Sequence, residues 1–151
     1  MRKDWEGYFM DFAILAAARS GCLSRQVGCV IVKDNRVIAT GYNAAPVGIQ
    51  ECVDRGSCLR KGSDSGTNLG YCFAVHAEQN AITQCAKYGI SCEGATLYVT
   101  AQPCATCAKL LVNAGIIEVV YLEPYPDELG IKILETSTVY VRQYTRKLQG
   151  L

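Results

Sequence analysis

Three side chains with affinity for zinc occur in two short motifs, His76-Ala77-Glu78 and Pro103-Cys104-Ala105-Thr106-Cys107. One imidazole and two thiolates suit Zn²⁺, and three protein ligands leave its fourth tetrahedral position open to water. Glu78 is not needed as a ligand, and it lies close enough to the histidine to carry a proton from that water. The motifs therefore predict a catalytic zinc site with His76, Cys104 and Cys107 as ligands and Glu78 as the general acid and base.

Simpler interpretations of the same residues exist. A closed structural zinc site also uses Cys and His, a C-x-x-C pair alone can be redox-active, and a helix can expose a His and a Glu to solvent without any function. The catalytic interpretation is favoured because the only histidine of the chain lies two residues before a Glu, and because the paired cysteines follow a predicted strand. A structural site has no use for an acid beside an open coordination position.

Hydrophobic periodicity predicts the elements that position these residues. A helix is expected at residues 4–19, with Asp4 as its N-cap and Gly21 as its stop, and Asp34-Asn35 predicts a hairpin between two β-branched runs. Two further helices each begin at one of the zinc motifs, so their N-termini should meet at one point. The expected strands are 27–33, 36–42, 95–100, 116–122 and 138–144, and the later helices are 75–88, 104–114 and 128–136.

Strands that alternate with helices after an opening hairpin predict one α/β domain over residues 1–151, with three α/β/α layers and a mixed central sheet. Residues 44–72 interrupt this pattern, because glycine and proline crowd a long irregular insertion. Such a long insertion in a compact domain needs a functional reason or an internal staple. Cys52, Cys58 and Cys72 lie in or at the end of this insertion.

The composition bounds the class of protein. A chain of 151 residues with 50% hydrophobic residues, 19% charged residues and a formal net charge of +1 is typical of a globular domain, and it disfavours non-specific binding to nucleic acid. The charged N-terminus lacks the apolar core of a signal peptide, and no apolar run is long enough to cross a membrane. We therefore expect a cytoplasmic protein, whose odd number of cysteines serves metal binding better than disulfides.

From about residue 5 to residue 125 the chain resembles the zinc-dependent cytidine deaminase superfamily, and within it the deoxycytidylate (dCMP) deaminases. The zinc motifs carry the superfamily resemblance. Gly41-Tyr42-Asn43, together with Asn80 two residues beyond Glu78, narrows it to the dCMP deaminases. The resemblance implies a cytidine deaminase-like fold and hydrolytic deamination of dCMP to dUMP and ammonia, which feeds thymidylate synthesis. Glu78 then delivers the proton of water to N3 of the cytosine ring and to the leaving amine.

The same resemblance implies the substrate contacts. Asn43 holds the deoxyribose 3′-hydroxyl, and the Ala77 backbone and the strand end at Gln102 contact the pyrimidine edge. Arg25 with Tyr121 holds the 5′-phosphate, for which a forked guanidinium is well suited. From local sequence alone, Asn43 is equally an ordinary turn residue and Arg25 a solvated loop charge.

The family also suggests further partners and a second metal. Its members assemble as homohexamers and respond to dCTP and dTTP with Mg²⁺, but here Ala44 replaces the glycine that usually follows Gly-Tyr-Asn and permits close backbone approach to a ligand. Several dCMP deaminases carry a second, structural zinc in the regions that here hold Cys22, Cys52, Cys58 and Cys72. Four thiolates would close a tetrahedral site, although the Cys52–Cys58 spacing is wide for a zinc knuckle and reduced thiols are the alternative. Cys29, Cys85 and Cys92 are interpreted as core residues.

Two other classes of function fit the motifs. Another deaminase of the superfamily, acting on dCTP, on cytidine or deoxycytidine, or on a tRNA adenosine, shares the zinc chemistry, although the near-zero net charge disfavours tRNA. A non-catalytic zinc module that binds a nucleotide is the second class.

Overall fold

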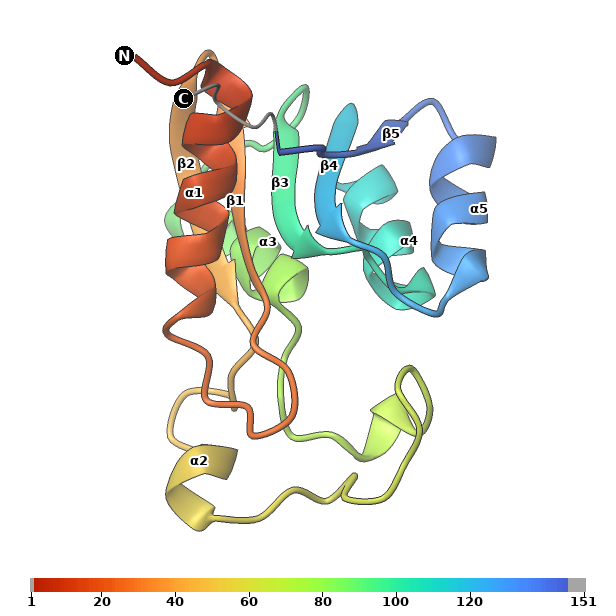
Figure 1. Cartoon of the computed structure of the whole chain (residues 1–151). Helices are drawn as coiled ribbons and strands as arrows, with labels where there is room; N and C mark the ends of the chain where they lie inside the picture. Colours follow the sequence, from red (N-terminus) through yellow and green to blue (C-terminus); the bar gives the residue numbers. More distant parts are fainter. Residues whose placement is uncertain (1, 147–151) are drawn as a thin grey trace, which may run out of the picture.

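The computed structural model describes residues 2–146, which surround a five-stranded sheet in the order β2-β1-β3-β4-β5 (Figure 1). β1 is antiparallel to both β2 and β3, whereas β3, β4 and β5 run parallel to one another. The predicted hairpin and mixed sheet are therefore confirmed. The strands are β1 (Gly28–Lys33), β2 (Arg36–Tyr42), β3 (Thr96–Ala101), β4 (Glu118–Glu123) and β5 (Tyr140–Gln143).

Helices cover both faces of this sheet and confirm the three predicted layers. On one face α1 (Trp5–Ala17) packs Phe9 and Met10 against Val30, Tyr98 and Val120. On the other face a larger core forms beneath the remaining long helices, with Leu97, Val99, Val119, Leu111 and Leu134 fully buried. Those helices are α3 (Ala77–Tyr88), α4 (Ala105–Asn113) and α5 (Glu128–Thr136).

The element boundaries follow local chemistry, with one correction. Asp4 caps α1 as predicted, because its side chain accepts a hydrogen bond of 2.8 Å from the Gly7 N–H. The helix nevertheless ends at Ala17 with Ala18 still in the right-handed helical region, so Gly21 is not its stop. Asp34 and Asn35 have φ of 51° and 56°, the left-handed pair that a two-residue hairpin turn requires.

The insertion at residues 44–72 is largely irregular, as predicted. It also contains two short helices that the sequence did not predict. These are α2 (Cys52–Arg55) and the 3-10 helix η1 (Leu69–Tyr71). Figure 1 shows the insertion extending beyond one end of the sheet. Its two ends are joined by a short antiparallel bridge, because Ala44 N–H donates to the Val75 carbonyl at 3.2 Å and Val75 N–H donates to the Ala44 carbonyl at 2.8 Å.

One end of the sheet therefore gathers the loops that could form a site. Tyr42 at the end of β2 pairs with Gly28 at the start of β1, and the Gly28 N–H donates to Thr100 Oγ1 near the end of β3 at 3.1 Å. Gly41 allows α3 to approach this end, since a Cβ there would overlap the Ala77 carbonyl oxygen and lie 2.9 Å from the Ala81 nitrogen. Within residues 2–146, no helix has the length and apolar character needed to span a membrane.

Candidate active site

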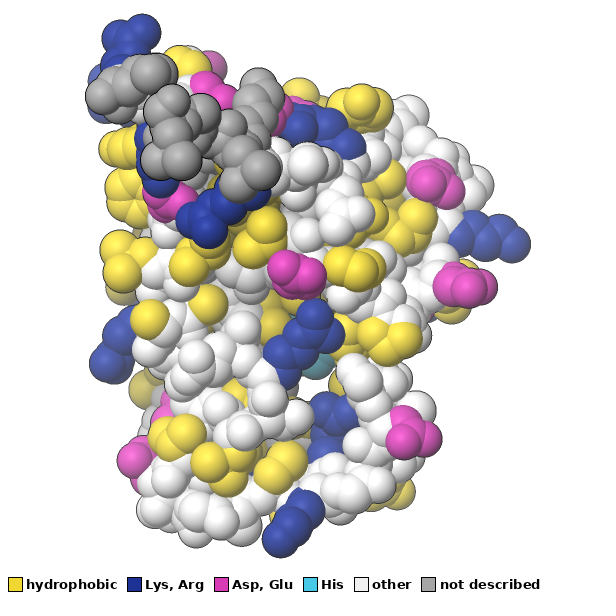
Figure 2. Space-filling view, in the orientation of Figure 1, with side chains coloured by type: hydrophobic (Ala, Val, Ile, Leu, Met, Phe, Trp, Pro, Cys, Tyr) yellow, Lys and Arg dark blue, Asp and Glu magenta, His cyan; other side chains and the backbone are white. Residues whose placement is uncertain are grey.

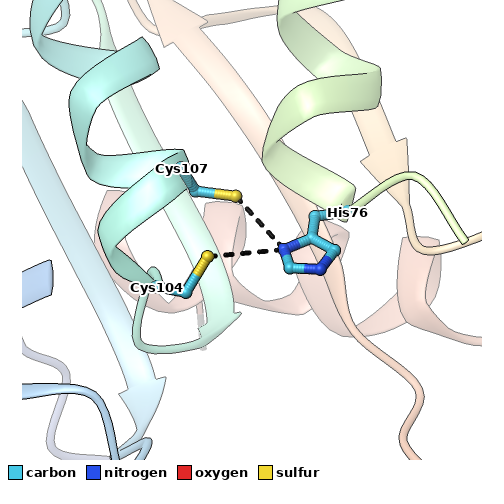
Figure 3. A group of neighbouring side chains, drawn as sticks. All are labelled: His76, Cys104 and Cys107. Carbon is cyan, nitrogen blue, oxygen red and sulfur yellow. Dashed lines mark hydrogen bonds between the residues drawn. The ribbon is translucent and has the colours of Figure 1, made fainter. Parts of the chain in front are cut away.

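The three predicted zinc ligands meet at one point, where the N-termini of α3 and α4 converge (Figure 3). His76 is the N-cap of α3, Cys104 is the N-cap of α4, and Cys107 lies in the first turn of α4. The His76 Nδ1 atom lies 3.5 Å from Cys104 Sγ and 3.4 Å from Cys107 Sγ. Tetrahedral zinc with ordinary Zn–S and Zn–N bonds needs about 3.6 Å between such atoms, so this donor set fits the ion through Nδ1.

The electrostatics of this cluster favour a thiolate at Cys104. Hydrogen bonds from Cys107 and His76 lower the pKa of Cys104 to about 4, against the opposing effect of burial. The hydrogen bond with Cys104 raises the pKa of His76. The hydrogen bond between Cys104 and Cys107, together with burial, raises the pKa of Cys107. Two helix N-termini aimed at this point further favour negative charge on the sulfurs.

Glu78 lies in the first turn of α3 with only 4% of its surface exposed. Burial raises the pKa of its carboxyl group, and the nearby carboxyl group in turn contributes to the raised pKa of Cys107. A carboxyl group whose pKa is raised toward neutrality can both accept and return a proton, which is the requirement for general acid and base catalysis. This buried position suits the predicted role of Glu78, which stays a prediction.

A cavity of about 740 Å³ opens onto this point. That volume lies in the range of small-molecule sites, and both His76 and Glu78 line it. Of the predicted substrate contacts, the structure brings Arg25, Asn43, Ala77 and Gln102 to its wall. Figure 2 shows the hollow, with basic side chains beside the exposed edge of the histidine.

The buried Asn43 side chain organises the loop that carries Arg25. Its Oδ1 accepts from Ser20 Oγ at 2.6 Å and from the Val27 N–H at 2.8 Å, and its Nδ2 donates to the Arg25 carbonyl at 2.7 Å. The second Nδ2 hydrogen has no partner among the described residues, so it can meet a ligand. Asn43 thus holds the wall of the cavity in place through contacts within the protein, in addition to any contact with a substrate.

Gln102 also has partners within the protein. Its Nε2 donates to the Asp127 carbonyl at 3.1 Å, and its Oε1 accepts from the Tyr125 N–H at 3.4 Å. The side-chain amide therefore secures the segment at residues 125–127 along the cavity. A pyrimidine contact from the strand end stays a prediction.

The structure places Tyr125, rather than Tyr121, beside Arg25. Tyr121 lies within β4 and packs against the core beneath the helices, so it does not line the cavity. The Arg25 guanidinium instead lies 5.0 Å from the ring centre of Tyr125, which does line it, and donates to the Pro124 carbonyl at 3.4 Å. No local pattern in the sequence indicated that Tyr125, which follows the end of β4, reaches the cavity.

The start of α5 supports the cysteine motif, a role that sequence analysis missed. Asp127 Oδ2 accepts from the Ala105 N–H at 2.8 Å while its Oδ1 accepts from the Gly130 N–H at 3.1 Å, so one carboxylate joins the starts of α4 and α5. Gly130 packs directly on the cysteine motif, because a Cβ there would overlap the Pro103 carbonyl oxygen and lie 3.0 Å from the Cys104 carbonyl carbon. An Asp immediately before a predicted helix was the local signal for the cap.

The four cysteines predicted to bind a second zinc all line the same cavity. Within residues 2–146, however, only His76, Cys104 and Cys107 bring three ligand atoms within 4.8 Å of one another. The Cys22 sulfur accepts from the Ser24 and Arg25 N–H groups at 3.4 and 3.5 Å, and the Cys72 sulfur accepts from the Ala74 N–H at 3.4 Å. Cys29, Cys85 and Cys92 are buried, in agreement with their interpretation as core residues.

Comparison with known proteins gives concordant matches. The family model for the cytidine and deoxycytidylate deaminase zinc-binding region matches residues 3–123. Deoxycytidylate deaminase of Saccharomyces cerevisiae is 44% identical over 146 residues, and that of Mycobacterium phage D29 is 44% identical over 127 residues. The alignments cover 96% and 80% of this chain, 46% of the yeast protein and 95% of the phage protein, so the chain spans under half the length of the yeast relative.

A solved structure shares the whole arrangement. The crystal structure of dCMP deaminase from the cyanophage S-TIM5 in complex with dCMP and dUMP matches with a TM-score of 0.81 and 32% identity, over 95% of this chain and 99% of that one. The three-layer fold described above is therefore the cytidine deaminase-like fold. With the zinc-ligand geometry and the family match over most of its length, the chain belongs to the cytidine and deoxycytidylate deaminase family.

Proposed function

We propose that this chain catalyses the hydrolytic deamination of dCMP to dUMP and ammonia. The dUMP would then feed thymidylate synthesis. The observation that carries the proposal is a buried carboxyl group beside a three-ligand zinc set, at the base of a cavity large enough for a nucleotide. The matched cyanophage protein, whose crystal structure holds dCMP and dUMP, supports this choice of substrate.

His76, Cys104 and Cys107 would hold the zinc ion, which when bound supplies Lewis-acid activation of a water molecule. Glu78 accepts a proton from water and delivers it to N3 of the cytosine ring. It then accepts the proton of the new C4 hydroxyl group and delivers it to the departing amine, so that C4 keeps the oxygen as a carbonyl group and ammonia leaves. Burial of Glu78 suits this role, since the raised pKa makes the carboxylate a stronger base and its protonated form available. The N-termini of α3 and α4 stabilise negative charge that develops beside them.

The substrate contacts follow from the cavity wall. Asn43 would bind the 3′-hydroxyl with its remaining Nδ2 hydrogen, while the Ala77 backbone and the strand end at Gln102 would contact the pyrimidine edge. Arg25 would bind the 5′-phosphate, and Tyr125 in place of Tyr121 would hold the guanidinium flat. The contact at 5.0 Å between the guanidinium carbon and the ring centre supports this pairing.

A second, structural zinc held by Cys22, Cys52, Cys58 and Cys72 forms part of the same proposal. Backbone N–H groups that donate to sulfur two or three residues earlier, as at Cys22 and Cys72, are the outer contacts that a thiolate ligand needs. Burial raises the pKa of Cys52, and Arg55, whose Nη2 donates to the Cys52 sulfur at 3.0 Å, lowers it. The neighbouring Cys58 and Cys22 raise it by a smaller amount, as expected when thiols lie near one another. A metal ion would relieve this repulsion and hold the insertion together.

Assembly and regulation stay predictions taken from the family: a homohexamer, and control by dCTP and dTTP with Mg²⁺. The cytoplasmic location expected from the sequence also stays a prediction. One structural fact bears on regulation. Ala44 is buried, and its backbone N–H and carbonyl are both hydrogen-bonded to Val75 at the base of the insertion. These two backbone groups are therefore already used within the protein and do not offer a contact to an effector.

A substrate panel tests the proposed activity. Zinc-loaded protein is incubated with dCMP, dCTP, deoxycytidine and an anticodon stem-loop, and ammonia release is measured alongside zinc content. We expect the highest kcat/KM on dCMP and its loss in Glu78→Gln. Preference for any other substrate would assign the chain to another deaminase of the family, and zinc-loaded protein inactive on all four would favour the non-catalytic zinc module.

A further inference from the structure

A second arginine reaches the cavity from the insertion. Arg60 is partly buried and lines the same space as His76 and Tyr125. Burial raises the pKa of Tyr125, and the positive charge of Arg60 opposes this rise. Arg60 thus lines the cavity although it lies 16 residues before His76 in the chain.

The Arg60 guanidinium is held in place by neutral groups only. Its Nε donates to the Thr67 carbonyl at 3.0 Å, and its Nη2 donates to the Asp64 carbonyl at 3.4 Å. A hydrogen bond of 2.7 Å, donated by Thr67 Oγ1 to the Asp64 carbonyl, closes the turn at residues 64–67. Nη1 makes no hydrogen bond to any residue in the described range 2–146, so part of the fork remains available to a ligand.

Charge in the cavity is unbalanced. Arg25, Arg60 and Lys61 line it, whereas among residues 2–146 the buried Glu78 is the only carboxylate in its lining. Within residues 2–146 the ion pairs involve Lys3 and Arg142, and neither Arg25 nor Arg60 has a carboxylate partner. Two partly buried guanidinium groups without counter-ions favour a bound anion, because burial without a partner is costly for a charge.

We propose that Arg60 is a specificity-determining residue that binds the 5′-phosphate of the substrate opposite Arg25. This inference rests on the proposed function and extends it to the insertion. A phosphate dianion offers oxygens to two forked donors at once, so it bridges the loop that carries Arg25 and the turn at residues 60–67. Binding of the phosphate therefore orders the insertion over the cavity, and a nucleoside without a phosphate does not.

Kinetics on paired substrates test the role of Arg60. Arg60→Ala, Arg60→Lys and the control Arg36→Ala, which removes an exposed charge at the start of β2, are assayed on dCMP and on deoxycytidine. We expect Arg60→Ala to raise KM for dCMP by about 10- to 100-fold and to leave kcat/KM for deoxycytidine within about twofold. Arg60→Lys should recover part of the loss, and Arg36→Ala should match the wild type. Zinc content of each variant shows whether the sites stay loaded.

Equilibrium binding separates this inference from the proposed reaction. Glu78→Gln protein, with and without Arg60→Ala, is titrated with dCMP and with deoxycytidine, so turnover is not needed. A loss of affinity confined to dCMP supports the phosphate contact even if the wild type releases no ammonia from dCMP. Equal losses on both ligands, or no loss on either, would overturn it.

Discussion

Gly130→Ala tests whether the packing of α5 on the cysteine motif sets the position of the zinc ligands. Gly130 lies in the first turn of α5 and makes no use of positive φ, so alanine suits its backbone conformation. Helix propensity alone should then stabilise the variant by up to ~1 kcal/mol. The added methyl group, however, would overlap the Pro103 carbonyl oxygen and lie 3.0 Å and 3.2 Å from the Cys104 carbonyl carbon and the Ala105 nitrogen.

The size of the effect follows from that overlap. Ordinary separation between non-bonded heavy atoms requires a shift of roughly 1 Å between α5 and the cysteine motif. Overpacking of a dense interior typically costs ~1–3 kcal/mol, which exceeds the gain in helix propensity. A displacement of this size at a reacting centre can cost ~100-fold in rate. We therefore expect kcat on dCMP to fall by about that factor and the midpoint of thermal unfolding to drop.

Gly70→Ala is the matched control. Gly70 lies in η1 without positive φ, and a Cβ there has open space within 4 Å. Both variants are compared by dCMP turnover, by thermal unfolding and by competition for zinc with a chelator. Gly130→Ala should lose zinc more readily than Gly70→Ala. Equal turnover and equal zinc retention in the two variants would refute the idea that contact with Gly130 positions Cys104.

Three further predictions use other parts of the site. Glu78→Gln should keep its zinc but lose dCMP deamination by at least ~10²–10⁴, and near wild-type turnover would exclude Glu78 as the proton carrier. Arg25→Ala should raise KM for dCMP by one to two orders of magnitude, about 1.5–3 kcal/mol, without slowing deoxycytidine turnover, whereas equal losses would make Arg25 structural. Metal analysis should find two zinc ions per chain in the wild type and one in Cys52→Ser, with Cys92→Ser as the control; one ion per wild-type chain would contradict the second site.

Much of the fold and the catalytic centre could be predicted because their signals are local. The hairpin depends on Asp34-Asn35, and the starts of α3 and α4 coincide with the two zinc motifs, so the meeting of His76 with the cysteines needed only the alternation of strands and helices. The position of Glu78 in the first turn of α3 was predicted from its spacing to the histidine, whereas its burial was not.

The contacts that sequence analysis missed depend on where distant segments pack. Tyr121 and Tyr125 are four residues apart, but β4 ends between them, so one faces the core and the other reaches the cavity. No local pattern shows that Gly130 must touch Pro103, since that need arises only from the approach of α5 to the cysteine motif. The placement of Arg60 likewise depends on how an irregular insertion turns back over the site.

The topology explains how such an insertion can be attached without disturbing the zinc ligands. Closing a longer loop costs little extra entropy once its ends are fixed. The Ala44–Val75 bridge holds the two ends of the insertion together, and Val75 lies one residue before His76. His76 is held separately, because its N–H donates to Gln79 Oε1 at 2.8 Å within α3. Order in the insertion and order at the catalytic centre are therefore separable, and a variant that loosens the insertion should weaken phosphate binding long before it releases the catalytic zinc.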